Sequence, residues 1–232
     1  MKETGILMKP DLAVKAERGE KSQTRRVMKS QPRFADENTR AVSDGTGGFV
    51  FWDGIGSTEK LEEFTRKEYA NKGFRCPFGK PGDCLYLKEP HWRWGHWERR
   101  QVRKGEPERW RFVAGDETVH PALFEAPNET PADRTHLGYH KRSPLFMPKA
   151  IARRWFEVTD VRVQRVHEIT PEDCMAEGIG YLYNYNKQDI PADARRRFAE
   201  LWNSINGRQP GCAWDDNPWV WAITFRRIDH ED

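Results

Sequence analysis

The chain has 232 residues, of which 37% are hydrophobic and 32% are charged, and its formal net charge is +3. We expect a cytoplasmic protein without membrane contact, because no apolar run is long enough for a membrane helix and no basic, apolar leader opens the sequence. The small net charge is not by itself evidence for a nucleic-acid partner.

The four cysteines are scattered without a C-x-x-C pair, which favours reduced thiols over a metal site. They are Cys76, Cys84, Cys174 and Cys212. We therefore expect neither a metal nor a cofactor. Zinc bound by Cys76 and Cys84 with nearby histidines is the open alternative.

The first regular elements are a short strand, a helix and a second strand. Ile6 and Leu7 predict the first strand, and residues 11–18 are helix-prone. Gly19 suits the left-handed position that ends a helix. Side chains alternate along the following strand, 22–28, so one face receives Ser22, Thr24 and Arg26 while the other receives Gln23, Arg25 and Val27.

Two stretches without regular patterning predict long, loop-rich insertions. The first runs from about 30 to 75, is rich in glycine and has one helix-prone segment at 59–71. The second runs from about 90 to 148 and mixes tryptophans with arginines and prolines. Between them, a Pro-Gly-Asp turn leads into a core strand at 84–89.

Clear patterning returns after the second insertion. Residues 154–166 predict a strand, and their apolar parity slips near Thr159-Asp160, which indicates a bulge or a hairpin bend. Thr170 can cap a short helix that begins with Pro171 and closes at Gly178.

The last two elements are a longer helix and a strand. An amphipathic pattern predicts the helix at about 191–206. The strand at 219–228 is apolar on both faces, which indicates that both are covered. Taken together, the elements predict an α+β protein with one domain over residues 1–232.

The most site-like cluster is an octet with G-x-K-x-x-T-x-R spacing, Gly19-Glu20-Lys21-Ser22-Gln23-Thr24-Arg25-Arg26. From the residues alone, Lys21 can equally be a solvated turn residue and the arginines surface charges. The octet resembles the signature of the ASCH superfamily. The whole chain is similar to ASCH-type proteins of tailed phages and prophages through two further segments, Cys76-Pro77-Phe78-Gly79-Lys80-Pro81-Gly82-Asp83 and Asn217-Pro218-Trp219-Val220-Trp221.

This resemblance implies a small PUA-like β-barrel flanked by helices, with the signature lining a cleft beside the barrel. It also implies that the domain binds RNA or a modified nucleoside in a bacterial or phage-infected bacterial cell. A role in phage assembly or interaction is the remaining reading of the resemblance. No feature of the sequence selects an oligomeric state.

An enzymatic alternative follows from the same resemblance. Small bacterial ASCH enzymes remove the acetyl group from N4-acetylcytidine, and their proposed lysine, threonine and glutamate match Lys21, Thr24 and Glu177. Thr24 would be the nucleophile, Lys21 the base and Glu177 the acid or water activator of an amidohydrolase. Lys21 can act as a base only if burial lowers its pKa. Glu177 lies in the last turn of its helix, where the helix dipole disfavours a carboxylate. Residues that break such a local preference are weak indications of a functional site.

A binding module is the competing class, with a nuclease as a further possibility. We expect Arg25, Arg26, Lys88, Glu89 and Trp92 to contact the RNA or nucleoside. Arginine forks suit phosphates, and aromatic rings stack on unpaired bases. The structural alternatives are that the arginines form ordinary salt bridges, one of them with Glu89, and that the tryptophans of the second insertion form a small core.

Overall fold

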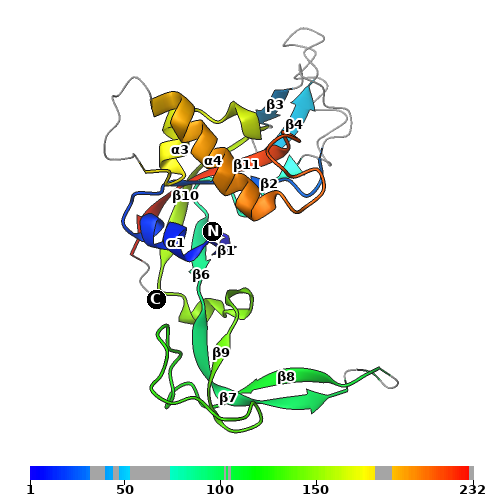
Figure 1. Cartoon of the computed structure of the whole chain (residues 1–232), viewed down its shortest axis with the longest axis vertical. Helices are drawn as coiled ribbons and strands as arrows, with labels where there is room; N and C mark the ends of the chain where they lie inside the picture. The colour runs from blue at the N-terminus through cyan, green and yellow to red at the C-terminus, as the bar shows by residue number, and fades with distance from the viewer. Residues whose placement is uncertain are drawn as a thin grey trace. The chain divides into compact units, whose positions relative to one another are not determined.

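The computed structural model describes residues 1–31, 40–43, 47–52, 74–101, 103, 106–180 and 190–229 (Figure 1). Contacts divide the chain into two compact units. The first comprises residues 1–4, 9–85 and 154–232, and the second comprises residues 5–8 and 86–153. The second unit therefore contains the whole stretch that the sequence marks as the second insertion.

The central element is a five-stranded sheet with the order β1-β6-β10-β11-β2. Its strands are β1 (Glu3–Leu7), β6 (Cys84–Lys88), β10 (Trp155–Arg165), β11 (Trp219–Ile228) and β2 (Gln23–Val27). Together with the helices, this sheet confirms the α+β class. Among the described strands, β1 and β2 are its two edges, and hydrogen bonds do not close it into a barrel.

The antiparallel pair of β10 and β11 runs from Trp155 opposite Ile228 to Arg165 opposite Trp219. The register shifts between Val158 and Asp160, which confirms the predicted bulge. The last strand is also as predicted, since residues 219–223 are buried on both faces of the sheet.

The helices begin and end close to the predicted residues. They are α1 (Pro10–Glu17), α3 (Pro171–Ala176) and α4 (Ile190–Asn206). The Thr170 hydroxyl accepts a hydrogen bond from the Asp173 N–H at 3.1 Å, and Gly178 closes α3 at a φ of +86°. Short 3₁₀ turns lie at Pro144–Phe146, Lys149–Ile151 and Val166–Glu168.

Helices α3 and α4 cover one face of the sheet near β11 and β2 (Figure 1). Their shared core contains Val166, Ile169, Cys174, Ile179, Ala194, Phe198, Trp202 and Val220. The amphipathic pattern of α4 is explained by this contact, because its apolar stripe is the buried one. None of the described helices is both long and apolar enough to cross a membrane.

A small three-stranded sheet belongs to the first insertion. Its order is β3 (Arg40–Ser43), β4 (Gly48–Trp52) and β5 (Phe74–Arg75). Phe49 of β4 meets Trp221 of β11 edge-on, with ring centroids 5.6 Å apart. The expectation of a loop-rich segment is therefore wrong for this part, while the helix expected at 59–71 lies outside the described residues.

The second insertion also contains a sheet, which the sequence did not predict, while its described residues between the strands, such as 115–137, form loops as expected. Strand β7 (His91–Arg100) pairs with β9 (Gly138–Arg142) along its first half and with β8 (Arg109–Ala114) along its second. Charged residues and Gly95 obscured the strand period of two in the sequence. At Gly95 a Cβ atom would lie 2.2 Å from the Val113 carbonyl oxygen, so glycine is required for the close approach of β7 and β8.

The tryptophans of β7 pack within the second unit. Trp94 stacks on His120 with ring centroids 3.9 Å apart. Trp97 meets Phe112 edge-on at 5.5 Å. These contacts match the structural alternative, a small core that holds the insertion together.

Replacing Thr170 with alanine tests the cap of α3. We expect the free energy of unfolding to fall by about 0.5–2 kcal/mol, because the Asp173 N–H loses its acceptor at the helix start. Urea denaturation of wild type, Thr170→Ala and Thr170→Ser measures the change. Thr170→Ser keeps the hydroxyl and should retain most of the stability; an equal loss in both variants would contradict the capping role.

Candidate functional site

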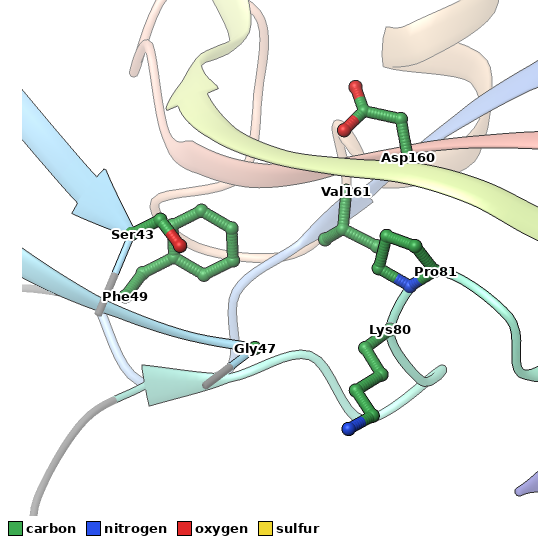
Figure 2. Close-up of a pocket in the computed structure, with 7 residues that line it drawn as sticks. All are labelled: Ser43, Gly47, Phe49, Lys80, Pro81, Asp160 and Val161. Carbon is green, nitrogen blue, oxygen red and sulfur yellow. The ribbon is translucent and has the colours of Figure 1, made fainter. Parts of the chain in front are cut away.

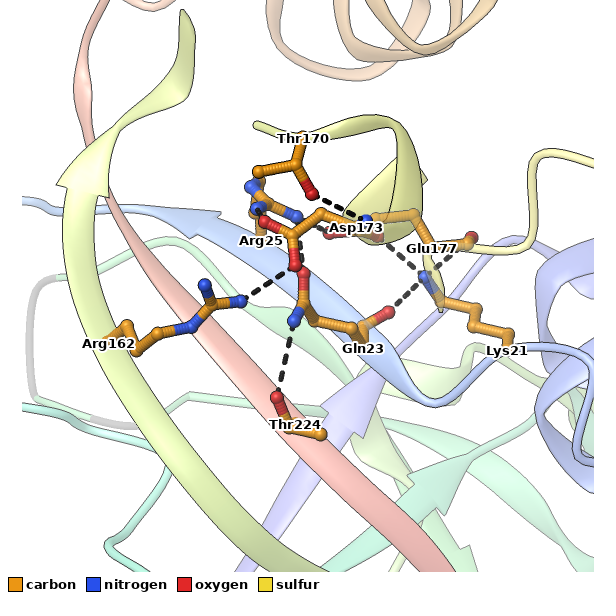
Figure 3. A network of polar contacts seen from close by, with 8 residues as sticks. All are labelled: Lys21, Gln23, Arg25, Arg162, Thr170, Asp173, Glu177 and Thr224. Atoms are coloured by element: carbon orange, nitrogen blue, oxygen red, sulfur yellow. Dashed lines mark hydrogen bonds and ion pairs between the residues drawn. The ribbon is translucent and has the colours of Figure 1, made fainter. Parts of the chain in front are cut away.

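Lys21 and Glu177 meet at the C-terminal end of α3 (Figure 3). The Lys21 Nζ lies 2.7 Å from Glu177 Oε2 and donates to the main-chain carbonyls of Glu177 at 2.9 Å and of Gln23 at 2.6 Å. Their side chains are only 1% and 5% exposed. All three N–H groups of the ammonium are therefore used inside the protein.

Local backbone geometry explains how Lys21 reaches this position. The octet turns immediately after α1, and the Ser22 N–H donates to the Ala176 carbonyl at 2.8 Å, which ties the turn to α3. A Cβ atom on Gly178 would lie 3.3 Å from Lys21 Cβ and 3.2 Å from Lys15 Cδ. Glycine thus supplies both the left-handed conformation that ends α3 and the space for the lysine.

Arg25 extends the same buried array toward the start of α3. Its guanidinium contacts Asp173 at 2.6 Å and Glu177 at 3.2 Å, and it donates to the Gln23 side-chain oxygen at 2.5 Å. Two cations therefore face two carboxylates in a largely buried region. This balance matters because removing one member of a buried ion pair leaves an uncompensated charge.

The array reaches solvent at one end. Arg162 of β10 donates to Asp173 Oδ1 at 2.8 Å, and the Gln23 amide donates to the Thr224 hydroxyl at 3.2 Å (Figure 3). Side-chain exposure rises from 1% at Lys21 through 12% at Asp173 to 42% at Arg162. A ligand could therefore touch the array at Arg162 without a rearrangement of Lys21.

Burial and neighbouring charges shift the pKa values in the array. Burial lowers the pKa of Lys21, and the charge of Glu177 opposes this without restoring the ordinary value. Burial by itself would raise the pKa of Asp173, but the hydrogen bond from Arg162 and the charge of Arg25 lower it below its usual value. Burial raises the pKa of Cys174 to about 11, so this thiol is protonated at neutral pH.

Thr24 takes no part in this array within the described residues. It pairs with Ile223 of β11, and because Gln23 and Arg25 face α3, strand alternation directs Thr24 and Arg26 to the opposite face. There the Arg26 guanidinium lies 5.9 Å from the centre of the Phe78 ring. The structure thus brings Lys21 and Glu177 together and leaves Thr24 on the other side of the sheet.

A cleft of about 440 Å³ lies on the Thr24 face (Figure 2). It is lined by Ser43, Gly47, Phe49, Lys80, Pro81, Asp160 and Val161. Val161 is opposite Ile223, which is opposite Thr24, so the three form one row across β10, β11 and β2. The lining provides an aromatic ring and a lysine in a space suited to a small molecule. The Asp160 carboxylate lies on the opposite side of β10 from Val161 (Figure 2), where it is 3.5 Å from Arg162.

The other predicted binding residues belong to the second unit and have partners there. The Lys88 ammonium donates to the Leu145 carbonyl at 2.9 Å. Glu89 is buried and forms an ion pair with Arg153 at 3.0 Å, which is the structural alternative for this residue. The main chain of Trp92 exchanges hydrogen bonds with Leu123 at 2.7 and 2.9 Å.

Sequence reasoning missed Gln23, Asp173, Arg162 and Thr224 as members of the array. One signal was available, since Asp173 and Glu177 are four residues apart and therefore share a face of the short helix. The strand alternation that pairs Gln23 with Arg25 was also visible. The contribution of β10 and β11 depends on register, which only the structure provides.

No group of three or more His, Cys, Asp or Glu side chains within the described ranges is placed to hold a metal ion. Comparisons with family models, curated proteins and solved structures found no match. The chemistry of the site therefore follows from its own geometry.

Asp173→Asn should make stability depend on pH in a specific direction. Because the pKa of Asp173 is lowered on folding, its ion pairs stabilise the protein above the ordinary carboxyl pKa of about 3.9, and this contribution is lost as the pH falls through the folded value. We expect the variant to be less stable than wild type by about 1.5–3 kcal/mol at neutral pH, with the difference shrinking below about pH 4.

Urea denaturation at several pH values between neutral and acidic measures this difference. Glu172→Gln, on the exposed side of the same helix, is the matched control and should change stability by no more than about 0.5 kcal/mol. A difference between wild type and Asp173→Asn that stayed constant with pH would exclude the ion-pair contribution.

Proposed function

We propose that this protein is an ASCH-type domain that binds RNA or a modified nucleoside. The single observation that carries the proposal is the cleft on the Thr24 face of the central sheet, with Phe49 and Lys80 in its lining. An aromatic ring can stack on a base, and an ammonium can donate to a carbonyl or phosphate oxygen. The volume lies within the range of roughly 300–1,000 Å³ that is usual for small-ligand sites.

The arrangement of the three resemblance segments supports the same proposal. The octet strand and the final strand are hydrogen-bonded neighbours, with Arg26 opposite Trp221. The segment from Cys76 to Asp83 joins β10, where Gly82 N–H donates to the Val158 carbonyl at 2.9 Å. Segments separated by most of the chain therefore gather around one sheet, as expected if that sheet corresponds to the PUA-like barrel.

Binding is favoured over catalysis because the charges of the buried array are already paired with one another. Lys21 donates all its N–H groups internally, and the guanidinium of Arg25 is committed to Asp173 and Glu177. The array acts as the support that fixes β2 against α3. The opposite face of β2 is then held in place beside the cleft.

The cleft can be tested by titrating the protein with cytidine, N4-acetylcytidine and short single-stranded RNA in a calorimeter. We expect Phe49→Ala and Lys80→Ala each to weaken binding about tenfold, since stacking on one ring contributes about 1–3 kcal/mol per base. Lys29→Ala, an exposed lysine outside the cleft lining, is the control for charge and should bind as wild type does. Unchanged affinity in both cleft variants would exclude this cleft as the site.

A second candidate is an amidohydrolase acting on N4-acylated cytidine, and the 2.7 Å contact between Lys21 and Glu177 favours it. In this reaction a water attacks the acyl carbonyl while Glu177 takes a proton from it. The bond between the carbonyl carbon and N4 then breaks, a proton returns to N4, and cytidine and the carboxylic acid are released. Thr24 as the nucleophile would require access across the sheet from its present face.

Incubation of the protein with N4-acetylcytidine and chromatography of the products tests this candidate. If hydrolysis uses the array, Glu177→Gln should lower the rate by at least about 100-fold, the usual scale of general acid or base catalysis, while Thr24→Val should retain most of it. Loss of activity in Thr24→Val alone would support the threonine nucleophile instead. No turnover by wild type at high enzyme concentration would remove the enzymatic candidate and leave the binding proposal intact.

A further inference from the structure

The second unit contains a two-stranded ribbon that the nucleoside proposal does not use. We define the β7–β8 ribbon as residues 95–114, in which Gly95–Arg100 pair with Arg109–Ala114. Beyond Gly95, β7 leaves β9 and pairs with β8 alone among the described strands. Most of the described side chains between Arg99 and Arg111 are exposed.

The ribbon concentrates the charge of the protein. Residues 95–114 contain six lysines and arginines and three acidic residues, a net charge of +3 that equals the charge of the entire chain. The remaining residues are therefore neutral overall. A locally basic element on an otherwise balanced protein is the electrostatic signature of a polyanion-binding surface.

Four exposed arginines lie on the two strands of the ribbon: Arg99, Arg100, Arg109 and Arg111. Arg100 is directly opposite Arg109, an arrangement of like charges that destabilises a strand pair. None of the four forms an ion pair with another residue in the described part of the chain. Such repulsion is relieved when an anion binds between the guanidinium groups.

The arginines are distributed over both faces of the ribbon. Arg99 shares a face with Trp110, and its guanidinium lies 5.1 Å from that ring, while Arg134 lies 5.0 Å from the same ring. Strand alternation puts Arg100, Arg109 and Arg111 on the opposite face. A partner must therefore present negative charge on two sides of the ribbon at once.

The groove of a nucleic-acid duplex has this property, because phosphates line both of its walls. The major groove of B-form DNA is wide enough for a two-stranded β-ribbon, whereas that of A-form RNA is too narrow for its base edges to be read. We propose that the β7–β8 ribbon binds in the major groove of duplex DNA, with the arginines of its two faces on the phosphates of the two strands. This site goes beyond the nucleoside cleft and does not depend on it.

The test measures binding of the full-length protein to a fluorescent B-form DNA duplex by anisotropy over a series of salt concentrations. We expect Arg100→Gln combined with Arg109→Gln to weaken binding about tenfold and to reduce the slope of log affinity against log salt by about 2. Arg18→Gln combined with Arg208→Gln removes the same charge from exposed positions outside the ribbon and should have little effect. Near-ultraviolet circular dichroism confirms that the ribbon variant keeps its tryptophan packing.

Each outcome bears on the proposal. Unchanged affinity in the ribbon variant, or an equal loss in the control variant, would overturn it. Tighter binding of duplex RNA or of single-stranded DNA by wild type would overturn the assignment to the DNA major groove. Nucleoside titration of the ribbon variant separates the two sites, since it should match wild type whether or not duplex DNA is bound.

Discussion

The structure of the first unit depends on one buried ion array, in which Lys21 and Arg25 face Asp173 and Glu177. Lys21, Arg25 and Glu177 are almost wholly out of water, so each needs its partner. Removal of one member of a fully buried ion pair typically costs about 3–5 kcal/mol, and the loss is smaller at the partly exposed Asp173. Helix α3 has six residues, which is too few to be stable in isolation. The array holds this helix on the edge strand β2, and α4 then packs on both.

Because side chains alternate along β2, the two faces of this strand have different roles. Gln23 and Arg25 fasten the strand to α3, while Thr24 and Arg26 face the side where Phe49 and the cleft lie. The residues of the octet 19–26 therefore do not all belong to one site. The two compact units also differ in chemistry, because the buried ion array lies in the first, while the second carries exposed arginines with no ion-pair partner among the described residues.

Part of the fold could be predicted from local sequence patterns. The cap at Thr170, the glycine stop at Gly178, the bulge near Thr159 and the apolar final strand all follow from neighbouring residues, and the structure agrees with each. The contact between Lys21 and Glu177 spans 156 positions and depends on where α3 docks, which no local pattern determines. Strand β7 was missed because Trp92 and Trp94 share one face while Trp97 falls on the other, so the alternation of apolar and polar residues breaks at Gly95.

The bulge in β10 also limits how the length of this strand can vary. On both sides of Thr159 the faces are assigned by β11, with Val158 opposite Phe225 and Asp160 opposite Thr224. Loss of the exposed Thr159 would join two segments that are already in register. Loss of Asp160 would likewise leave Val161 opposite Ile223, because Thr159 would take the place opposite Thr224. That deletion would, however, remove the carboxylate beside Arg162. The bulge therefore lets β10 lose either of two residues without changing which side chains face the cleft.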